Sequence, residues 1–205
     1  MAENNQIRTV IFDIGRVLIE FEWKDYILGL FDEKTAIAVT EAMWKTGYWH
    51  ELDRAVLTEE EILSLFYSAA PEYREEILTA FERVGECVKR LDYAIPWIED
   101  LKARGYQVLF LSNYSMHVMS SNPAALDFLP HMDGGVFSCD VKLIKPDPAI
   151  FAAICDKYDL TPSACLFIDD NAANVEAARA FGMNAIRFKT YEQARADVDR
   201  MLGEA

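Results

Sequence analysis

Three apolar stretches of the sequence each end abruptly in polar side chains that are able to take part in catalysis. Short apolar runs without alternation are typical of strands that are buried on both faces of a parallel sheet. The carboxyl ends of parallel strands lie at one edge of the sheet, and open α/β folds bind their ligands there. Each run is followed at once by its polar residues: residues 10–12 by Asp13, residues 108–111 by Ser112 and Asn113, and residues 166–168 by Asp169 and Asp170. With the helical segments between them, these runs predict an α/β fold, a Rossmann-like parallel sheet covered by helices on both faces.

A long insert separates the first two of these strands. Parallel neighbours need a crossover of only about a dozen residues, whereas the expected strands at 9–12 and 106–111 lie several times farther apart. Residues 33–45 carry apolar side chains at helical spacing, Thr58 opens a capping box, and Pro71 begins another helical pattern. We therefore expect a core of residues 1–20 and 95–205, and an inserted helical cap of residues 21–94.

The charge of the chain limits its partners. It has 34 acidic residues against 20 Lys and Arg, which gives a formal net charge of −14 at pH 7. Because such a surface repels nucleic acid phosphates and anionic lipids, we expect neither nucleic acid nor membrane as a partner. Residues 1–8 are polar, no apolar run has the length to span a bilayer, and the four cysteines, none in a C-x-x-C pair, indicate free thiols. We expect a cytoplasmic protein, and nothing in the sequence distinguishes a monomer from a dimer.

Four motifs resemble those of the haloacid dehalogenase superfamily, and the likeness extends over nearly the whole chain. They are VIFDIGRVL from residue 10, VLFLSN from residue 108, IKPDPAIF from residue 144, and LFIDDNAANVEAARAFGM from residue 166. The segment GYWHELDRAVLTEEEI, from residue 47, is similar to the helical cap of the subclass with an insert after the first strand. Within the superfamily, the Asp-Ile-Gly sequence resembles most closely the phosphatases that act on glucose 1-phosphate.

The resemblance implies a role for each motif in phosphoryl transfer. Asp13 would be the nucleophile, and Lys145 would neutralise the phosphate and the aspartyl-phosphate intermediate. Ser112 and Asn113 would donate hydrogen bonds to the phosphate oxygens. Mg²⁺ would be held by Asp13, by the backbone carbonyl of Gly15 and by Asp170, with Asp169 as a ligand directly or through water. The residues themselves support a cation, because two adjacent carboxylates after a buried strand repel each other unless a positive charge intervenes.

For several further residues the sequence leaves more than one role open. Asn174, one helical turn after Asp170, would orient the site or lie on a helix surface. Arg16 would clamp the phosphate, pair with an acid of the site, or point away. In the insert, Trp49 and His50 would contact the substrate, or Trp49 would pack in the cap core and His50 would be exposed. The same alternatives hold for a small set of neighbours: Trp23, Tyr26, Trp44, Tyr48 and Arg54.

Gly15 is a departure from the pattern of most phosphatases of the superfamily, which have an aspartate two residues after the nucleophile. That aspartate protonates the leaving group, and loss of a general acid costs about 10²–10⁴-fold in rate. The loss is smaller for acidic leaving groups, so Gly15 favours sugar 1-phosphates, acyl phosphates or aryl phosphates. We expect a Mg²⁺-dependent phosphatase of a small phosphorylated metabolite, such as glucose 1-phosphate. The alternatives are a hydrolytic 2-haloacid dehalogenase and a non-catalytic phosphate-binding relative.

Overall fold

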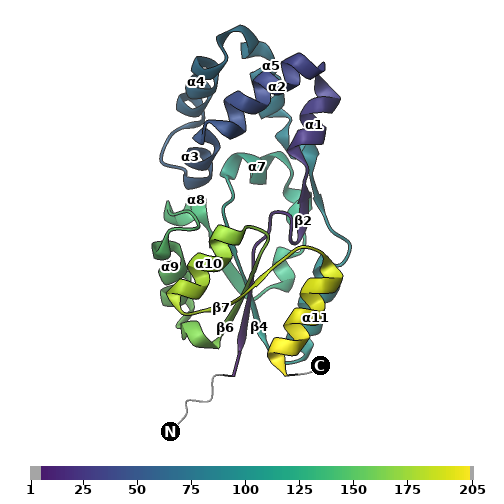
Figure 1. Cartoon of the computed structure of the whole chain (residues 1–205), viewed down its shortest axis with the longest axis vertical. Coiled ribbons are helices and arrows are strands. Elements are labelled where there is room, and N and C mark those ends of the chain that lie inside the picture. Colours follow the sequence, from purple (N-terminus) through teal and green to yellow (C-terminus); the bar gives the residue numbers. More distant parts are fainter. Residues whose placement is uncertain (1–5, 204–205) are drawn as a thin grey trace.

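The computed structural model describes residues 6–203, and a five-stranded parallel sheet forms the centre of its lower half (Figure 1). The strands lie in the order β5-β4-β1-β6-β7, so the first strand is central and the chain crosses over on either side of it. This arrangement confirms the predicted α/β class. The strand bounds are β1 Thr9–Phe12, β4 Gln107–Ser112, β5 Gly134–Phe137, β6 Cys165–Asp169 and β7 Asn184–Arg187.

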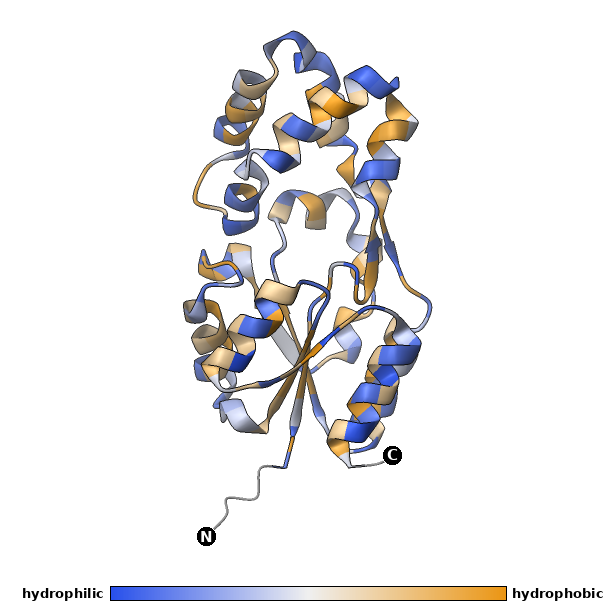
Figure 2. Cartoon of the chain, viewed as in Figure 1, coloured by the Kyte–Doolittle hydropathy of each residue, from blue (hydrophilic) through white to orange (hydrophobic). Residues whose placement is uncertain are grey.

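The two faces of the sheet are both covered by helices, which is why the central residues of its strands are apolar (Figure 2). On one face, Ile11 and Phe167 pack with helices α9 and α10. On the other face, Phe12 and Ile168 pack with helices α6 and α11. The core helices are α6 Ala94–Ala103, α7 Met116–Ser121, α8 Ser138–Val141, α9 Pro148–Tyr158, α10 Ala172–Phe181 and α11 Tyr191–Leu202. Short 3₁₀ turns cover Pro123–Leu126, Leu129–His131 and Pro162–Ala164.

The insert forms a helical layer above the carboxyl edge of the sheet (Figure 1). Its helices are α1 Trp23–Leu30, α2 Glu33–Thr40, α3 Tyr48–Arg54, α4 Glu59–Ala69 and α5 Arg74–Glu82, with 3₁₀ turns at Pro71–Tyr73 and Val84–Cys87. An antiparallel ribbon of β2 Ile19–Phe21 and β3 Val88–Arg90 joins this layer to the sheet. We propose that residues 21–94 act as a cap and that the ribbon is its connection to the core.

The sequence predicted some elements of the insert and missed others. Thr58 forms the expected capping box with Glu61 at the start of α4. In contrast, the single helix expected over residues 33–45 divides into α2 and a π-helical turn, Glu41–Lys45. The ribbon strands were not predicted, because three residues are too few for a period to be recognised.

Two other sequence-based expectations concern membranes and the amino terminus. Within residues 6–203, none of the helices combines the length and the apolar character that crossing a bilayer requires. The expectation drawn from residues 1–8 falls mostly outside the described residues. The four cysteines are free thiols, as predicted, and three of them are buried.

Candidate active site

The ends of β1 and β6 bring two carboxylates to either side of one buried lysine. The ammonium nitrogen Nζ of Lys145 lies 2.8 Å from Oδ1 of Asp13 and 2.7 Å from Oδ2 of Asp169. It also donates a hydrogen bond of 2.8 Å to the backbone carbonyl of Leu111, at the end of β4. Lys145 therefore uses its three donors on three strands of the sheet, and this fixes its position at the carboxyl edge.

The two carboxylates differ in how many protein partners they have. Asp169 is fully buried, and besides Lys145 it accepts hydrogen bonds from the backbone amide of Asn171 (2.8 Å) and from Nδ2 of Asn174 (3.0 and 3.1 Å to its two oxygens). The Asp13 carboxylate accepts from Lys145 and, through the same oxygen, from the amide of Ile14 at 2.7 Å. Asp13 therefore keeps an oxygen free for an incoming group, whereas the oxygens of Asp169 are largely occupied.

Burial sets the electrostatics of this group. Burial raises the pKa of Asp13 to about 7; Lys145 opposes that rise, and the charges of Asp169 and Asp170 add to it. Burial alone would lower the pKa of Lys145, but the charges of Asp13 and Asp169, with the hydrogen bonds to both, raise it above its ordinary value. The pKa of Asp170 is also raised, by burial and by the charge of Asp169. One lysine is thus shared among three acids, and the protein alone leaves a surplus of negative charge.

That surplus fits a divalent cation. One carboxylate oxygen from each of Asp13, Asp169 and Asp170 lies within 4.8 Å of the others. Hard oxygen ligands in this number suit Mg²⁺, and a cation would relieve the mutual repulsion that raises the pKa values. Because the oxygens of Asp169 are engaged by Lys145, Asn171 and Asn174, Asp13 and Asp170 offer the freer oxygens. Asn174, which is buried, lies beside Asp169 rather than on the helix surface.

The two polar residues at the end of β4, Ser112 and Asn113, have different surroundings. The side chain of Asn113 donates to the backbone carbonyl of Lys145 (3.0 Å) and accepts from its backbone amide (2.8 Å). The Ser112 hydroxyl is buried and has no hydrogen-bond partner among the described residues. Since a buried hydroxyl without a partner is costly, Ser112 is a fitting donor for a ligand oxygen.

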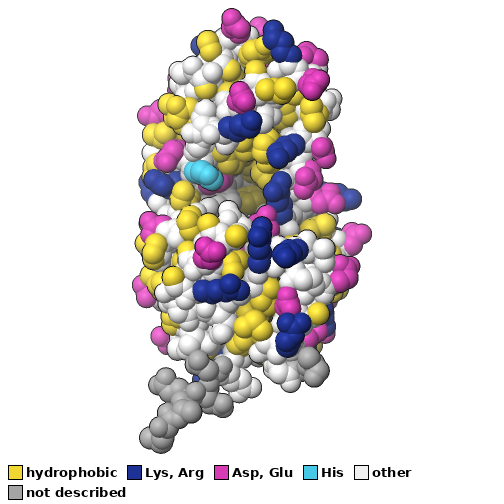
Figure 3. Space-filling view, in the orientation of Figure 1, with side chains coloured by type: hydrophobic (Ala, Val, Ile, Leu, Met, Phe, Trp, Pro, Cys, Tyr) yellow, Lys and Arg dark blue, Asp and Glu magenta, His cyan; other side chains and the backbone are white. Residues whose placement is uncertain are grey.

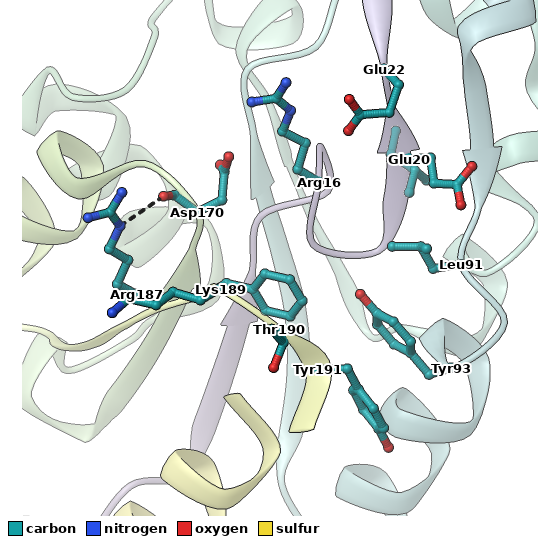
Figure 4. A pocket seen from close by; sticks show the side chains of 12 residues that line it. Arg16, Glu20, Glu22, Leu91, Tyr93, Asp170, Arg187, Lys189, Thr190 and Tyr191 are labelled. Atoms are coloured by element: carbon teal, nitrogen blue, oxygen red, sulfur yellow. Dashed lines mark hydrogen bonds between the residues drawn. The ribbon is translucent and has the colours of Figure 1, made fainter. Parts of the chain in front are cut away.

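Arg16 lies on the solvent side of this group. It adopts a left-handed backbone conformation (φ 59°) in the turn after β1, and its side chain points toward Asp170 (Figure 4). Its positive charge lowers the pKa of Asp170 and so opposes the effect of burial on that group. Both residues border a pocket of about 560 Å³ that extends over β7 and the start of α11, away from Asp13. In this pocket, Arg187 donates from Nε to the backbone carbonyl of Asp170 at 3.3 Å.

The acids and the insert enclose a second, smaller pocket of about 270 Å³, at the hollow that Figure 3 shows between the two halves of the molecule. Asp13, Lys145 and Asp170 line it from the core. From the insert it is lined by Phe21, Trp23, His50 and Asp53. The floor of the pocket is therefore charged and its roof is largely aromatic, so a small anion with an organic group would fit both.

The remaining aromatic residues of the insert have mixed positions. Trp49 is buried and lines an adjoining pocket, and Trp44 stacks between it and Trp23, with ring centroids 4.9 and 4.7 Å away. Tyr26 donates from its hydroxyl to the carbonyl of Ala80, inside the helical layer. Two further residues, Tyr48 and Arg54, are half-buried and line neither pocket.

Asp53 was not predicted from the sequence as a site residue. It lies in the segment His50-Glu51-Leu52-Asp53-Arg54, where its charged neighbours indicate an exposed helix face. In the structure its side chain is buried, because α3 packs against α8 of the core. Only the tertiary contact between two segments 85 residues apart shows that this acid faces the site.

Comparison with known proteins identifies the family of the chain. Residues 7–182 match a family of hydrolases described as haloacid dehalogenase-like hydrolases. A phosphatase of Mycobacterium tuberculosis, MT3486, is 28% identical over 212 residues, which cover 96% of this chain and 94% of the relative. (S)-2-Haloacid dehalogenase 1 of a Pseudomonas species is 31% identical over 94 residues, which cover 46% of this chain and 41% of the dehalogenase. The chain spans only 19% of another relative, mouse acyl-CoA dehydrogenase family member 10.

Solved structures show the same fold. A HAD-like family hydrolase from Porphyromonas gingivalis superposes with a TM-score of 0.76 at 22% identity, covering 98% of this chain and 100% of that one. A HAD family enzyme from Bacteroides thetaiotaomicron, solved in complex with magnesium and inorganic phosphate, gives a TM-score of 0.69 at 17% identity, with 92% and 98% covered. L-2-Haloacid dehalogenase from Xanthobacter autotrophicus gives 0.63 at 16% identity, with 94% and 83% covered. At these identities the likeness shows the fold alone.

Proposed function

Because the chain belongs to the haloacid dehalogenase-like hydrolases, we propose that it is a Mg²⁺-dependent phosphatase acting through an aspartyl-phosphate. The observation that carries the proposal is the group of three carboxylates, Asp13, Asp169 and Asp170, around a single buried lysine. A dehalogenase has no need of a cation, whereas this group has a surplus of negative charge that a cation would balance. The near full-length likeness to the mycobacterial phosphatase supports the same activity.

Each residue of the site has its own role in phosphoryl transfer. The free oxygen of Asp13 attacks phosphorus, and the bond from phosphorus to the leaving oxygen breaks. Lys145 neutralises charge on the phosphoryl oxygens, and the Ser112 hydroxyl donates a hydrogen bond to one of them. A bound Mg²⁺ would supply further positive charge toward the phosphate, and Asp13 and Asp170 would hold it. Water then attacks phosphorus and releases Asp13 and inorganic phosphate.

The pocket indicates a small substrate. At about 270 Å³ it lies near the lower end of the usual range for small-molecule sites, which is roughly 300–1,000 Å³. A monosaccharide phosphate suits that size, and the aromatic side chains of Phe21 and Trp23 suit a sugar ring. Glucose 1-phosphate is the candidate that the sequence favours, and we keep it as the first substrate to test. The cytoplasmic location and the absence of nucleic acid and membrane partners stay predictions.

A 2-haloacid dehalogenase is the second candidate, because the Pseudomonas dehalogenase is 31% identical over nearly half of the chain. In that reaction Asp13 would attack carbon and displace halide. Gly15 speaks against it, since dehalogenases of the superfamily commonly carry an aromatic residue at that position. A non-catalytic phosphate-binding relative is disfavoured, because Asp13, Lys145 and Asp170 all line one pocket.

One experiment distinguishes the phosphatase from the dehalogenase and from the non-catalytic relative. Purified protein is assayed with p-nitrophenyl phosphate, glucose 1-phosphate and glucose 6-phosphate, and with (S)-2-chloropropionate, each with Mg²⁺ and with a chelator. We expect Mg²⁺-dependent release of phosphate, no release of chloride, and loss of turnover in Asp13→Asn, whose amide cannot form the acyl phosphate. Release of chloride in metal-free buffer would replace the proposal by the dehalogenase. Phosphate binding without turnover of any ester would identify the non-catalytic relative.

A further inference from the structure

Asp53 of the helical layer faces the nucleophile across the active-site pocket. It is 7% exposed and lines the same pocket as Asp13, Lys145 and Asp170. It also lines an adjoining pocket of about 140 Å³, together with Trp49 and Tyr114. Asp53 therefore lies between the charged floor, where the phosphate would bind, and an apolar hollow that could take the organic part of a substrate.

The carboxyl group of Asp53 is buried without a polar partner among the described residues. It makes no hydrogen bond or ion pair with any residue in the range 6–203. Carboxylates are seldom buried without a partner, because burial of an unpaired charge is costly. Its backbone, in contrast, is held: Ser138 of α8 donates from Oγ to the Asp53 carbonyl at 2.6 Å, and accepts from the Tyr114 amide at 2.9 Å. The core thus fixes the position of Asp53 and leaves its side chain free to serve a ligand.

Gly15 provides the space that this arrangement needs. The glycine lines both pockets with Asp53, and a Cβ atom placed on it would meet nothing within 4 Å. In most phosphatases of the superfamily an acid occupies that position. Here the acid is missing from the strand end, and a buried acid from α3 lines the same space.

We propose that Asp53 is the general acid and base of the phosphatase, in place of the aspartate that Gly15 lacks. This inference rests on the proposed function. In the first step the Asp53 carboxyl gives its proton to the leaving oxygen as the bond from phosphorus to that oxygen breaks. In the second step the Asp53 carboxylate takes a proton from the attacking water, and the bond between phosphorus and Asp13 breaks. The proton that Asp53 gives up is thus regained in each cycle.

The electrostatic environment supports this role. Burial raises the pKa of Asp53 to about 8, with a further rise from the charge of Asp13 and a smaller opposing effect from Lys145. The carboxyl group is therefore protonated near neutral pH, as a proton donor must be. Halide needs no proton as it leaves, so a dehalogenase would have no use for Asp53 as an acid.

The test compares leaving groups in Asp53→Asn and the wild type, with Glu51→Gln as the matched acid-to-amide control on the same helix. The values of kcat/KM are measured for p-nitrophenyl phosphate and for an alkyl phosphate such as glucose 6-phosphate. In Asp53→Asn we expect kcat/KM for the alkyl ester to fall by about 10²–10⁴-fold and that for the aryl ester by less than about 10-fold. Because the second step also loses its base, p-nitrophenol should be released in a burst. Glu51→Gln should behave as the wild type.

A second test combines Gly15→Asp with Asp53→Asn. Added to Asp53→Asn, it should restore hydrolysis of the alkyl ester, since the new carboxyl enters the same space. Equal losses for both esters in Asp53→Asn would overturn the inference. A wild type without phosphatase activity would instead overturn the proposed function, and this inference with it.

Discussion

Replacement of Lys145 by methionine tests how strongly the site depends on its buried cation. Methionine has nearly the same length but no charge, so Asp13, Asp169 and the carbonyl of Leu111 would lose a shared donor that lies 2.7–2.8 Å from each of them. The lysine and Asp169 side chains are 1% and 0% exposed. Removal of one partner from a buried ion pair typically costs about 3–5 kcal/mol, which is a large part of a domain's usual stability of about 5–15 kcal/mol.

The loss in Lys145→Met should depend on pH in a defined direction. The pKa of Asp13 is already raised to about 7 by burial, and removal of Lys145 takes away the charge that opposes this rise. An acid whose pKa is raised in the folded state stabilises the fold fully below its unfolded pKa, and this stability is lost as the pH rises through the folded pKa. Since the variant can keep Asp13 protonated at low pH, its deficit relative to the wild type should be smallest near about pH 6 and largest near about pH 8.5.

Urea unfolding, followed by tryptophan fluorescence in the presence of a chelator, measures this effect at both pH values. The matched control is Lys45→Met, which removes an exposed lysine that pairs with Glu41 one helical turn away, at 3.3 Å. The control should unfold at the wild-type midpoint. Unfolding of Lys145→Met at the wild-type midpoint near about pH 8.5, or a deficit that grows as the pH falls, would contradict a stabilising role of the Lys145 charge.

Three further outcomes follow from the contacts of the site. Chelation of Mg²⁺ should stop hydrolysis of p-nitrophenyl phosphate, and re-addition should restore it. Full turnover in metal-free buffer would show that the cation is not required. Ser112→Ala should lower kcat/KM by about 10²-fold without lowering the free energy of unfolding, because its hydroxyl has no partner in the described protein; a clear loss of stability would contradict this. Asn174→Ala should weaken Mg²⁺ activation by about 10–100-fold through Asp169, measured as the Mg²⁺ concentration for half-maximal activity, and an unchanged value would show that the contact is only structural.

The sheet and its functional edge could be predicted because they depend on short, continuous segments of the sequence. Apolar runs of three or four residues that stop at Asp13, Ser112 and Asp169 are recognisable without tertiary information. The order β5-β4-β1-β6-β7 then places these ends side by side.

What the sequence did not reveal depends on contacts between distant segments. Asp53 resembles a solvated residue among charged neighbours, and its burial results from packing of α3 on α8. The reciprocal hydrogen bonds between Asn113 and Lys145 join residues 32 positions apart. The division of residues 33–45 into α2 and a π-helical turn changes no hydrophobic period that the sequence displays. In each case the local pattern was compatible with two structures, and packing decided between them.

The most direct test of the account is the mass of the peptide that contains Asp13 after acid quenching during turnover of p-nitrophenyl phosphate. We expect this peptide to gain the mass of one phosphoryl group in the wild type and to stay unmodified in Asp13→Asn. Asp53→Asn should increase the modified fraction, because hydrolysis of the acyl phosphate is slowed. Release of phosphate by the wild type, with the Asp13 peptide unmodified at every quench time and in the Asp53→Asn background, would contradict nucleophilic catalysis by Asp13.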